Sequence, residues 1–596
     1  MLCEVSDTRH AAVFLQDACY QHQYIRSRDL SAIVERPERL RAVTIGLSAA
    51  IARLELVVPT KQHINTRGDE DPDDLVAAMN RMNLILDHES PISIIQSHAS
   101  VDILANPAVK FVHGDVDGDV YLENLKQWAE DSRNKIHKGE SEIPSGLAQG
   151  DLYLCPESIA AIQGALGTVC EAVDVVISTS RNATKQPMAG TPNMSVNPPA
   201  HRAFVAVRPP GHHCGEDSPA GFCFVNNVAV GAAHAHLQHG INRVVILDID
   251  LHHGNGTQSI TWQINEETYR QTLESEGGSP NAKSGPQIYY GSIHDILSYP
   301  CEDGKPNLIQ AASVSLHKSH GQYIENIHLQ TYTSEIHFWD VLYKEQYSKI
   351  LRKAEEFLDG TGGPGDDVMV FISCGMDACE HEYESMSRHN RKVPTSFYYR
   401  FARDVCAFSD RYACGRVVSV LEGGYSNRAL ISGTMAHLAG LTDDSPSGGK
   451  VDESWWDVDN LAKLEKATKK RRGGRPSLNN NVVEPWLERA LTIYSSLDTT
   501  YTRATSPSTT RGTTLPPTSM TLRERKPKSV SPVPSPSAKR GKTAGGSEGE
   551  VKVLVPLAKA NSVTSSSSNS TDDDLGLNKG PKKLPRVILR LGPEPS

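Results

Sequence analysis

The chain has 596 residues, a formal net charge of −10 and only 38% hydrophobic residues. This length exceeds one ordinary domain, and the lack of any run of 18 apolar residues predicts no membrane span. The start of the chain lacks the charged and apolar regions of a secretory signal, and no pair of its 11 cysteines has CxxC spacing. We therefore expect a reducing compartment, with cysteines as small core residues rather than disulfides.

Residues 1–440 predict an α/β catalytic domain. Its expected core is a single open, mostly parallel β-sheet covered by helices on both faces. Helical spacing of apolar residues predicts helices over 157–177 and 225–240, the second ending at Gly240. Short Val- and Ile-rich runs without strict alternation predict strands buried on both faces; they cover 203–207, 244–247, 314–316, 368–372 and 417–421.

The C-terminal part has a different composition. We expect residues 441–500 to form a linker that includes one amphipathic helix over 484–497. Residues 501–596 are rich in Ser, Thr and Pro, which predicts a disordered tail.

Charge is also divided unevenly between these parts. Residues 505–596 contain 15 Lys or Arg and 7 Asp or Glu, a balance of +8, so residues 1–504 carry −18. Basic runs at 469–472, 523–528 and 538–542 resemble nuclear import signals or nucleic-acid patches. Each run is equally compatible with a solvated charged segment that binds no partner.

Four of the predicted strands are followed directly by polar residues. The four segments read RPPGHHCGE, DIDLHHGNG, SCGMDACEHE and EGGYS. In open parallel sheets, ligands bind in the crevice at the carboxyl ends of the strands, so we expect the segments to converge there. Taken singly, each motif is equally compatible with a tight turn or an exposed loop, and the convergence gives them their weight.

Two of these segments contain potential metal ligands. Asp250 and His252 are two residues apart in an extended stretch, so their side chains point to the same side. Asp377, after another strand, would add a third ligand. One His and two carboxylates leave a position open for water, as a catalytic Zn²⁺ site requires.

The other polar residues suit proton transfer and charge stabilisation. His212 and His213 are natural general-base and general-acid candidates, because histidine titrates near neutral pH. Asp248 and Asn255 have the chemistry needed to hold the tautomers of these imidazoles. The Tyr425 hydroxyl can hydrogen-bond an oxyanion.

Substrate contacts are predicted beside these groups. The glycines of the EGGYS segment, Gly424 among them, let the backbone approach a ligand closely. Phe222 in GFCF would wall an apolar channel, although a core position suits it nearly as well.

Six segments resemble the zinc-dependent histone deacetylases of the arginase–deacetylase fold. They read VERPERLRAV, RPPGHH, GFCFVNNVA, DIDLHHGNGTQ, SCGMDACE and LEGGY, in this order. The likeness covers roughly residues 10–440. The residues of GFCFVNNVA and the presence of Asn255 resemble the class II members of this family. The insertions and the tail are most similar to those of fungal HOS-type deacetylases.

The resemblance implies a function and an active site. The function is hydrolysis of the acetyl amide of N6-acetyl-lysine on histones or other proteins, which releases acetate and regulates chromatin and transcription. The location implied is the nucleus, with the cytoplasm as a second one. The zinc ligands implied are Asp250, His252 and Asp377, and the implied catalytic groups are His212, His213, Asp248, Asn255 and Tyr425.

Further contacts are also implied by the resemblance. Phe222, Gly221 and Gly424 would line the acetyl-lysine tunnel, with Tyr323 as its second aromatic wall. Asp151 would be the acidic residue that grips the substrate backbone. A structural K⁺ ion would be bound near the zinc by Asp248, Asp250, the backbone of His252, Ser315 and Leu316.

Other functions are compatible with parts of this pattern. An arginase-like ureohydrolase needs a further Asp two residues after the metal-binding His, where this chain has Gly254. A deacetylase of small acetylated amines such as polyamines would use the same catalytic residues. A catalytically weak acetyl-lysine-binding scaffold is a third possibility, against which Tyr425 and the complete ligand set argue.

The expected partners follow from these functions. They are acetylated histone tails or other acetyl-lysine proteins, importin through the basic runs, and a homo-oligomer or a corepressor complex. No membrane partner is expected.

Overall fold

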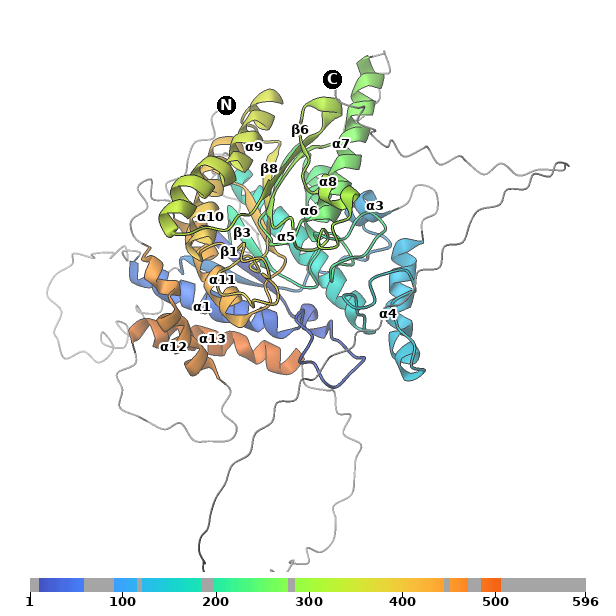
Figure 1. Cartoon of the computed structure of the whole chain (residues 1–596). Coiled ribbons are helices and arrows are strands. Elements are labelled where there is room, and N and C mark those ends of the chain that lie inside the picture. The colour runs from blue at the N-terminus through green and yellow to red at the C-terminus, as the bar shows by residue number, and fades with distance from the viewer. Residues whose placement is uncertain are drawn as a thin grey trace, which may run out of the picture. The chain divides into compact units, whose positions relative to one another are not determined.

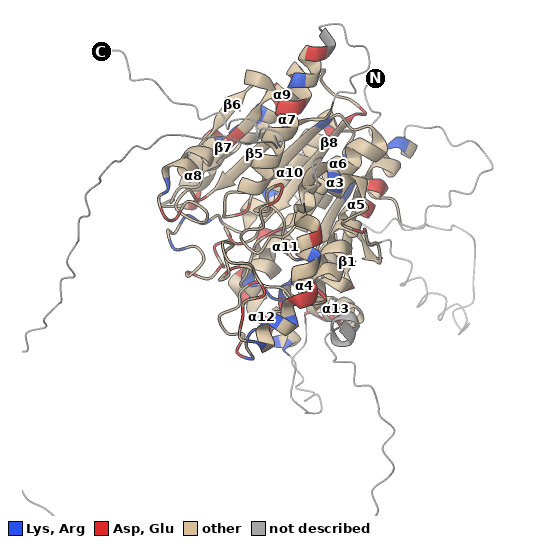
Figure 2. Cartoon of the chain, turned by 90° about the vertical axis from the view of Figure 1, so that its right-hand side faces the viewer, with Lys and Arg blue, Asp and Glu red and all other residues tan. Residues whose placement is uncertain are grey.

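The computed structural model describes residues 10–57, 90–114, 120–183, 198–276, 285–443, 451–469 and 484–504. Within them, helices cover both faces of one nine-stranded sheet (Figure 1). The sheet is the most deeply buried part, and in Figure 2 most charged residues lie on the helices and loops around it. The predicted α/β architecture is therefore confirmed.

The strands of the sheet are parallel except at one edge. The five predicted strand runs all contribute, but the run at 314–316 forms an antiparallel edge strand rather than the doubly buried parallel one we expected. From edge to edge the order is β2 (Ile92–Ser97), β1 (Ala11–Gln16), β3 (Arg202–Ala206), β9 (Val417–Leu421), β8 (Val368–Cys374), β4 (Arg243–Asp248), β5 (Gln287–His294), β7 (Tyr323–His328) and β6 (Ser315–His317).

The predicted helices are present in the described residues, together with several others. Helix α6 ends where expected, with Gly240 in the left-handed conformation at φ +69°. The helices are α1 (Glu38–Val57), α3 (Pro107–His113), α4 (Tyr121–His137), α5 (Ser158–Ala183), α6 (Asn227–His239), α7 (Asn255–Glu276), α8 (Pro306–Ala311), α9 (Lys349–Gly360), α10 (Ser396–Tyr412), α11 (Asn427–Thr442), α12 (Val458–Thr468) and α13 (Pro485–Ala504).

Helix α5 is the one described helix that is long and apolar enough to span a membrane. Its most apolar window has a mean hydropathy of 1.5, and 72% of that window is buried inside the protein. A core helix of a folded domain has these same properties.

The amphipathic helix predicted over 484–497 is α13, which packs along α1. Its apolar face is buried through Trp486, Ala490 and Tyr494. The Arg53 guanidinium of α1 lies 3.8 Å from the centroid of a Trp486 ring. The division into catalytic domain, linker and tail stays a prediction, and the tail after residue 504 lies outside the described residues, as do the basic runs within it.

The cysteines follow the sequence-based expectation with one exception. Nine of those in the described residues are free and buried. Cys414, two residues after the end of α10, is disulfide-bonded, so the expectation of no disulfides is wrong at this position.

Candidate active site

The predicted metal ligands come together at the carboxyl ends of adjacent strands. Strand β4 lies beside β8, with Asp248 opposite Ser373, and Asp250 and His252 follow the end of β4. Asp377 follows the end of β8. One ligand atom from each of Asp250, His252 and Asp377 lies within 4.8 Å of the others, and all three side chains are buried.

Backbone amides hold the two carboxylates in place. The Leu251 N–H donates to Asp377 Oδ1 at 2.9 Å, and the Gly423 N–H donates to Asp250 Oδ2 at 2.7 Å. A Cβ at Gly423 would lie 2.2 Å from Asp377 Oδ2, so only glycine allows the β9 loop this close to the carboxylates. This explains the first glycine of the pair after the strand.

The donor set fits a divalent cation such as Zn²⁺. Asp377 Oδ2 is buried and accepts no hydrogen bond, although it lies 2.9 Å from His252 Nδ1. Burial and the nearby Asp250 carboxylate raise the pKa of Asp377. Two crowded carboxylates and an imidazole with an unused oxygen between them match a His–Asp–Asp zinc site with an open position.

The two predicted proton-transfer histidines lie beside the ligands. Their rings are 4.1 Å apart between centroids. His212 Nδ1 is 3.1 Å from Asp248 Oδ2, and His213 Nδ1 is 2.8 Å from Asn255 Oδ1. Because an amide oxygen only accepts, His213 carries its proton on Nδ1 and presents the Nε2 lone pair. Both predicted orienting residues are therefore in contact with their histidines.

The two imidazoles have opposite pKa shifts. Burial disfavours charge on His212, but the Asp250 and Asp248 carboxylates outweigh it and raise its pKa to about 10. Burial and the neighbouring His212 charge lower the pKa of His213 well below its ordinary value. In the absence of metal, His212 is thus the cation of the pair and His213 the neutral base.

The predicted residues Phe222 and Tyr425 pack against each other. The Phe222 and Tyr425 rings are 5.8 Å apart. Burial raises the pKa of Tyr425 well above its usual value, so its hydroxyl stays protonated and can donate. Gly221, with φ +50°, lies so close to His213 that a Cβ would be 2.3 Å from His213 Cδ2. Gly424 also has a positive φ, and a Cβ there would lie 3.0 Å from Met376 Cβ.

Comparisons with known proteins agree with this geometry. Residues 79–441 match the histone deacetylase domain. The chain belongs to the histone deacetylase family. Histone deacetylase HOS3 of Saccharomyces cerevisiae is 35% identical over 456 residues, which are 74% of this chain and 57% of the yeast protein. This relative also confirms the predicted similarity to fungal HOS-type deacetylases.

Other members of the family match shorter parts. Type-2 histone deacetylase 1 of Dictyostelium discoideum is 26% identical over 50% of this chain and 20% of its own length. The chain thus spans less than two thirds of these relatives. A solved structure titled "Crystal Structure of HDA15 HD domain" aligns with a TM-score of 0.45 and 19% identity, over 83% of this chain and 99% of the solved one.

Several residues that support this deacetylase-family site were not predicted. Arg39 Nε donates to Gly424 O at 2.7 Å, and its guanidinium lies 5.0 Å from the Tyr425 ring centroid. Both oxygens of Glu382 accept backbone N–H groups, from Tyr425 at 2.6 Å and from Ser426 at 2.8 Å. Arg39 belongs to the VERPERLRAV segment and Glu382 ends the SCGMDACEHE segment, but neither residue was given a role.

Tyr299 takes the place predicted for Tyr323. The Tyr299 ring lies 4.8 Å from the His213 ring, and the Asp151 charge contributes to the raised pKa of Tyr299. Tyr323 instead lies on β7 and packs 4.6 Å from the Phe357 ring. The prediction for Tyr323 is therefore wrong, while Asp151 stays a candidate for substrate contact at this end of the site.

The potassium ligands predicted at Ser315 and Leu316 are not brought to Asp248. Both residues lie on the edge strand β6, which β5 and β7 separate from β4. The Ser315 hydroxyl donates to Glu325 Oε2 at 2.6 Å. The residue opposite Asp248 on the neighbouring strand β5 is Ser292. Ser315 and Leu316 therefore cannot share one ion with Asp248 in this arrangement.

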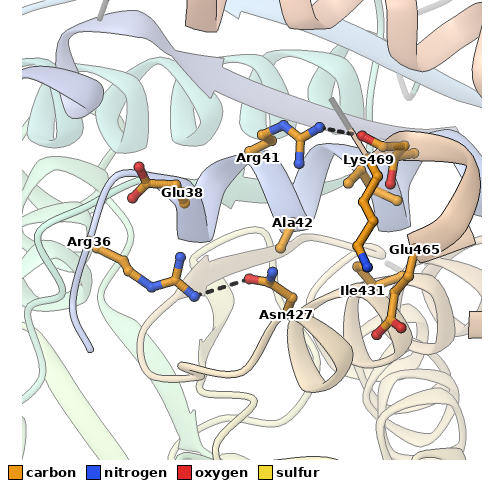
Figure 3. Close-up of a pocket in the computed structure, with 10 residues that line it drawn as sticks. Arg36, Glu38, Arg41, Ala42, Asn427, Ile431, Glu465 and Lys469 are labelled. Carbon is orange, nitrogen blue, oxygen red and sulfur yellow. Dashed lines mark hydrogen bonds between the residues drawn. The ribbon is translucent and has the colours of Figure 1, made fainter. Parts of the chain in front are cut away.

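A separate pocket of about 230 Å³ lies between α1, α11 and α12 (Figure 3). Arg36 Nη2 donates to Asn427 Oδ1 there at 3.2 Å, as Figure 3 shows. Its lining includes none of the predicted site residues. Basic and acidic side chains alternate around it, so no single charge class of ligand is favoured.

Proposed function

We propose that this chain is a zinc-dependent deacetylase that hydrolyses the acetyl amide of N6-acetyl-lysine in histones or other proteins. The observation that carries the proposal is the buried Asp250–His252–Asp377 cluster beside two histidines with opposite pKa shifts. Membership of the histone deacetylase family supports the same reaction class. A substrate amide that reaches this cluster would meet all the groups that its hydrolysis needs.

Asp250, His252 and Asp377 would hold the zinc ion. Bound there, Zn²⁺ would supply Lewis acidity that polarises the amide carbonyl and makes water more acidic. The chain itself would supply the remaining steps. Gly423 contributes by keeping the backbone close to the two carboxylates without a side chain.

Proton transfer would fall to the histidine pair. His213 Nε2 would take the proton from the attacking water, because Asn255 fixes the other ring nitrogen as the donor. The proton would then pass to the amine of the leaving lysine. The cationic His212, paired with Asp248, would stabilise negative charge that develops beside it.

Tyr425 would donate a hydrogen bond from its hydroxyl to the oxyanion of the tetrahedral intermediate. Arg39 and Glu382 would act as positioning residues, since they hold the backbone on either side of Tyr425. The rings of Phe222 and Tyr299 would flank the linear part of the acetyl-lysine side chain and exclude water from the site.

The test is acetate release from an acetyl-lysine histone peptide by the purified full chain, with zinc counted in the same sample. We expect turnover, and we expect Asp377→Asn to abolish it together with zinc at this site. Glu325→Gln is a matched control, because Glu325 is a buried carboxylate on β7 that pairs with Lys349. Bound zinc at the cluster without turnover on any acetylated peptide would contradict the proposal.

A smaller substrate is the second candidate. The catalytic residues would act equally on acetylated polyamines, and only the shape of the entrance distinguishes the two substrate classes. Asp151, whose charge acts on Tyr299, favours a peptide, because a carboxylate near the bound chain would accept backbone N–H groups. Asp151→Asn should therefore reduce turnover of an acetyl-lysine peptide more than turnover of acetylspermidine.

We also propose a location and partners for this chain. Nuclear localisation, importin binding, a corepressor assembly and a role in transcription are proposed from the family and from the basic runs. Removal of residues 505–596 from a fluorescently tagged chain tests the import role. A truncated chain that still enters the nucleus would contradict import through the two basic runs in that segment.

A further inference from the structure

A second group of metal-binding side chains lies between helices α5 and α6. Asp174 comes from α5, and His234 and His239 come from α6. The two helices pack side by side, as both views show (Figures 1 and 2). One ligand atom from each of the three side chains lies within 4.8 Å of the others.

The geometry of this group is convergent. His234 Nε2 lies 2.8 Å from Asp174 Oδ1, and His239 Nε2 lies 2.6 Å from the same oxygen. The two imidazole rings are 5.9 Å apart and inclined by 70°. Two nitrogens from different rings thus converge on a single carboxylate oxygen, which places all three potential ligand atoms together.

The chemistry of the group favours zinc over calcium or magnesium. Two imidazoles and one carboxylate are nitrogen-rich, whereas Ca²⁺ and Mg²⁺ take oxygen ligands. Cys170, one helical turn before Asp174, is a free buried cysteine in hydrogen-bonding contact with His234. Its thiol is not one of the three converging ligand groups.

The surroundings admit a cation. His234 and His239 lie in the last turns of α6, where the helix dipole favours positive charge. The nearby Arg181 is paired with Asp366 at 3.0 Å, which reduces its repulsion. The Asp174 side chain is 51% exposed, so an ion can enter from solvent and keep a water ligand.

This group is remote from the site described above. Helix α6 ends just before β4 begins, so the group lies toward the amino ends of the strands. The Asp250–His252–Asp377 cluster follows their carboxyl ends. We propose that Asp174, His234 and His239 bind a second Zn²⁺ ion, which joins α5 to α6 independently of the proposed catalytic function.

Metal counting tests the proposal. The full chain is loaded with zinc, equilibrated against a weak chelator and analysed by mass spectrometry of the metal. We expect two zinc ions per chain, one in the double variant His234→Asn/His239→Asn, and one in Asp377→Asn. His236→Gln is the matched control on α6, because His236 bonds to Ile241 O outside the group and should leave the count at two. A wild-type count of one, lost in Asp377→Asn, would overturn the proposal.

A second measurement does not depend on folding of the double variant. In Asp377→Asn the catalytic cluster is disabled, so added Zn²⁺ should raise the melting temperature only through the α5–α6 group. An additional Asp174→Asn exchange should remove that increase. No increase in Asp377→Asn at zinc concentrations that load the wild-type chain would equally overturn the proposal. Deacetylation by Asp174→Asn alone, if unchanged from wild type, would separate the two sites.

Discussion

Two groups of buried charged residues lie close together in this molecule. They differ in whether guanidinium groups of the protein neutralise the buried carboxylates. Around Glu35, the Arg208 guanidinium donates to both carboxylate oxygens, at 2.8 and 2.6 Å. Arg39 adds a further contact to Glu35 at 3.1 Å. In the ligand cluster, Asp250 and Asp377 face each other and His252 with no guanidinium or ammonium group among the ligand atoms.

The pKa values reflect this difference. Burial opposes ionisation of Glu35, but Arg208 outweighs it and lowers the pKa of Glu35 far below its ordinary value. Burial and Asp250 together raise the pKa of Asp377. The scaffold carboxylate is thus neutralised by guanidinium groups. Of the two ligand carboxylates, His212 and His252 outweigh burial and lower the pKa of Asp250, whereas Asp377 is left the more poorly compensated one. This crowding at Asp377 distinguishes the ligand cluster from the group around Glu35.

The largest expected effect tests the ligand cluster. Asp377→Asn should abolish deacetylation, while the metal-free protein should keep or gain stability, because the exchange removes one of two crowded buried carboxylates. Zinc should stabilise the wild-type protein more than the variant, by about 4 kcal/mol at a concentration of 1,000 Kd. Denaturant unfolding with and without zinc measures both quantities. A large loss of stability in the metal-free variant would show that the cluster is balanced without metal.

The next effect concerns catalysis alone. Tyr425→Phe removes the proposed oxyanion donor but no ligand, so kcat should fall by roughly 10²–10³-fold with zinc content unchanged. Steady-state kinetics with metal counting gives both numbers. Tyr299→Phe is a suitable comparison, because it removes a hydroxyl from the other side of the site and keeps the ring against His213. Equal losses in the two variants would remove the special role assigned to Tyr425.

The sequence predicted this site better than it predicted the sheet. Asp250 and His252 could be found because both ligands follow one recognisable strand, and Asp377 because it follows another. Strand β5 was missed because Gly291 and polar residues interrupt its apolar pattern. Gly291 is needed there, since a Cβ would lie 2.4 Å from Ile350 Cγ1. Without β5, Ser292 could not be placed opposite Asp248, and Ser315 was chosen instead.

Single residues in loops also could not be predicted from sequence patterns. Tyr299 and Glu382 act through distant partners, and nothing in their immediate sequence indicates those contacts. Tyr323 was predicted for the tunnel although it lies on β7, whose distance from the His pair depends on strand order. Local motifs therefore identified the candidate reacting groups, whereas the groups that position them could be found only from the three-dimensional arrangement.

A third prediction tests the group around Glu35. Glu35→Gln removes one partner from a fully buried ion pair and leaves Arg208 uncompensated, so the free energy of unfolding should fall by about 3–5 kcal/mol. The folded-state pKa of Glu35 is below its ordinary value of 4.5, so its contribution is present above that pH and is lost as pH falls. The difference between wild type and variant should therefore be full at pH 7 and shrink below pH 4.5. A difference that grows on acidification would contradict this assignment.

The smallest effect is expected where charges are paired at the surface. Arg489 of α13 donates to both oxygens of Glu55 on α1, at 2.8 and 2.9 Å, much as Arg208 does to Glu35. The Arg489 side chain is 50% exposed, so solvent screens the pair, and Arg489→Gln should reduce the free energy of unfolding by only about 0.2–1 kcal/mol. Denaturant unfolding at low and high salt measures the loss, which should decrease further as salt is added. A loss as large as that of Glu35→Gln would mean that bidentate geometry, rather than burial, sets the strength of both pairs.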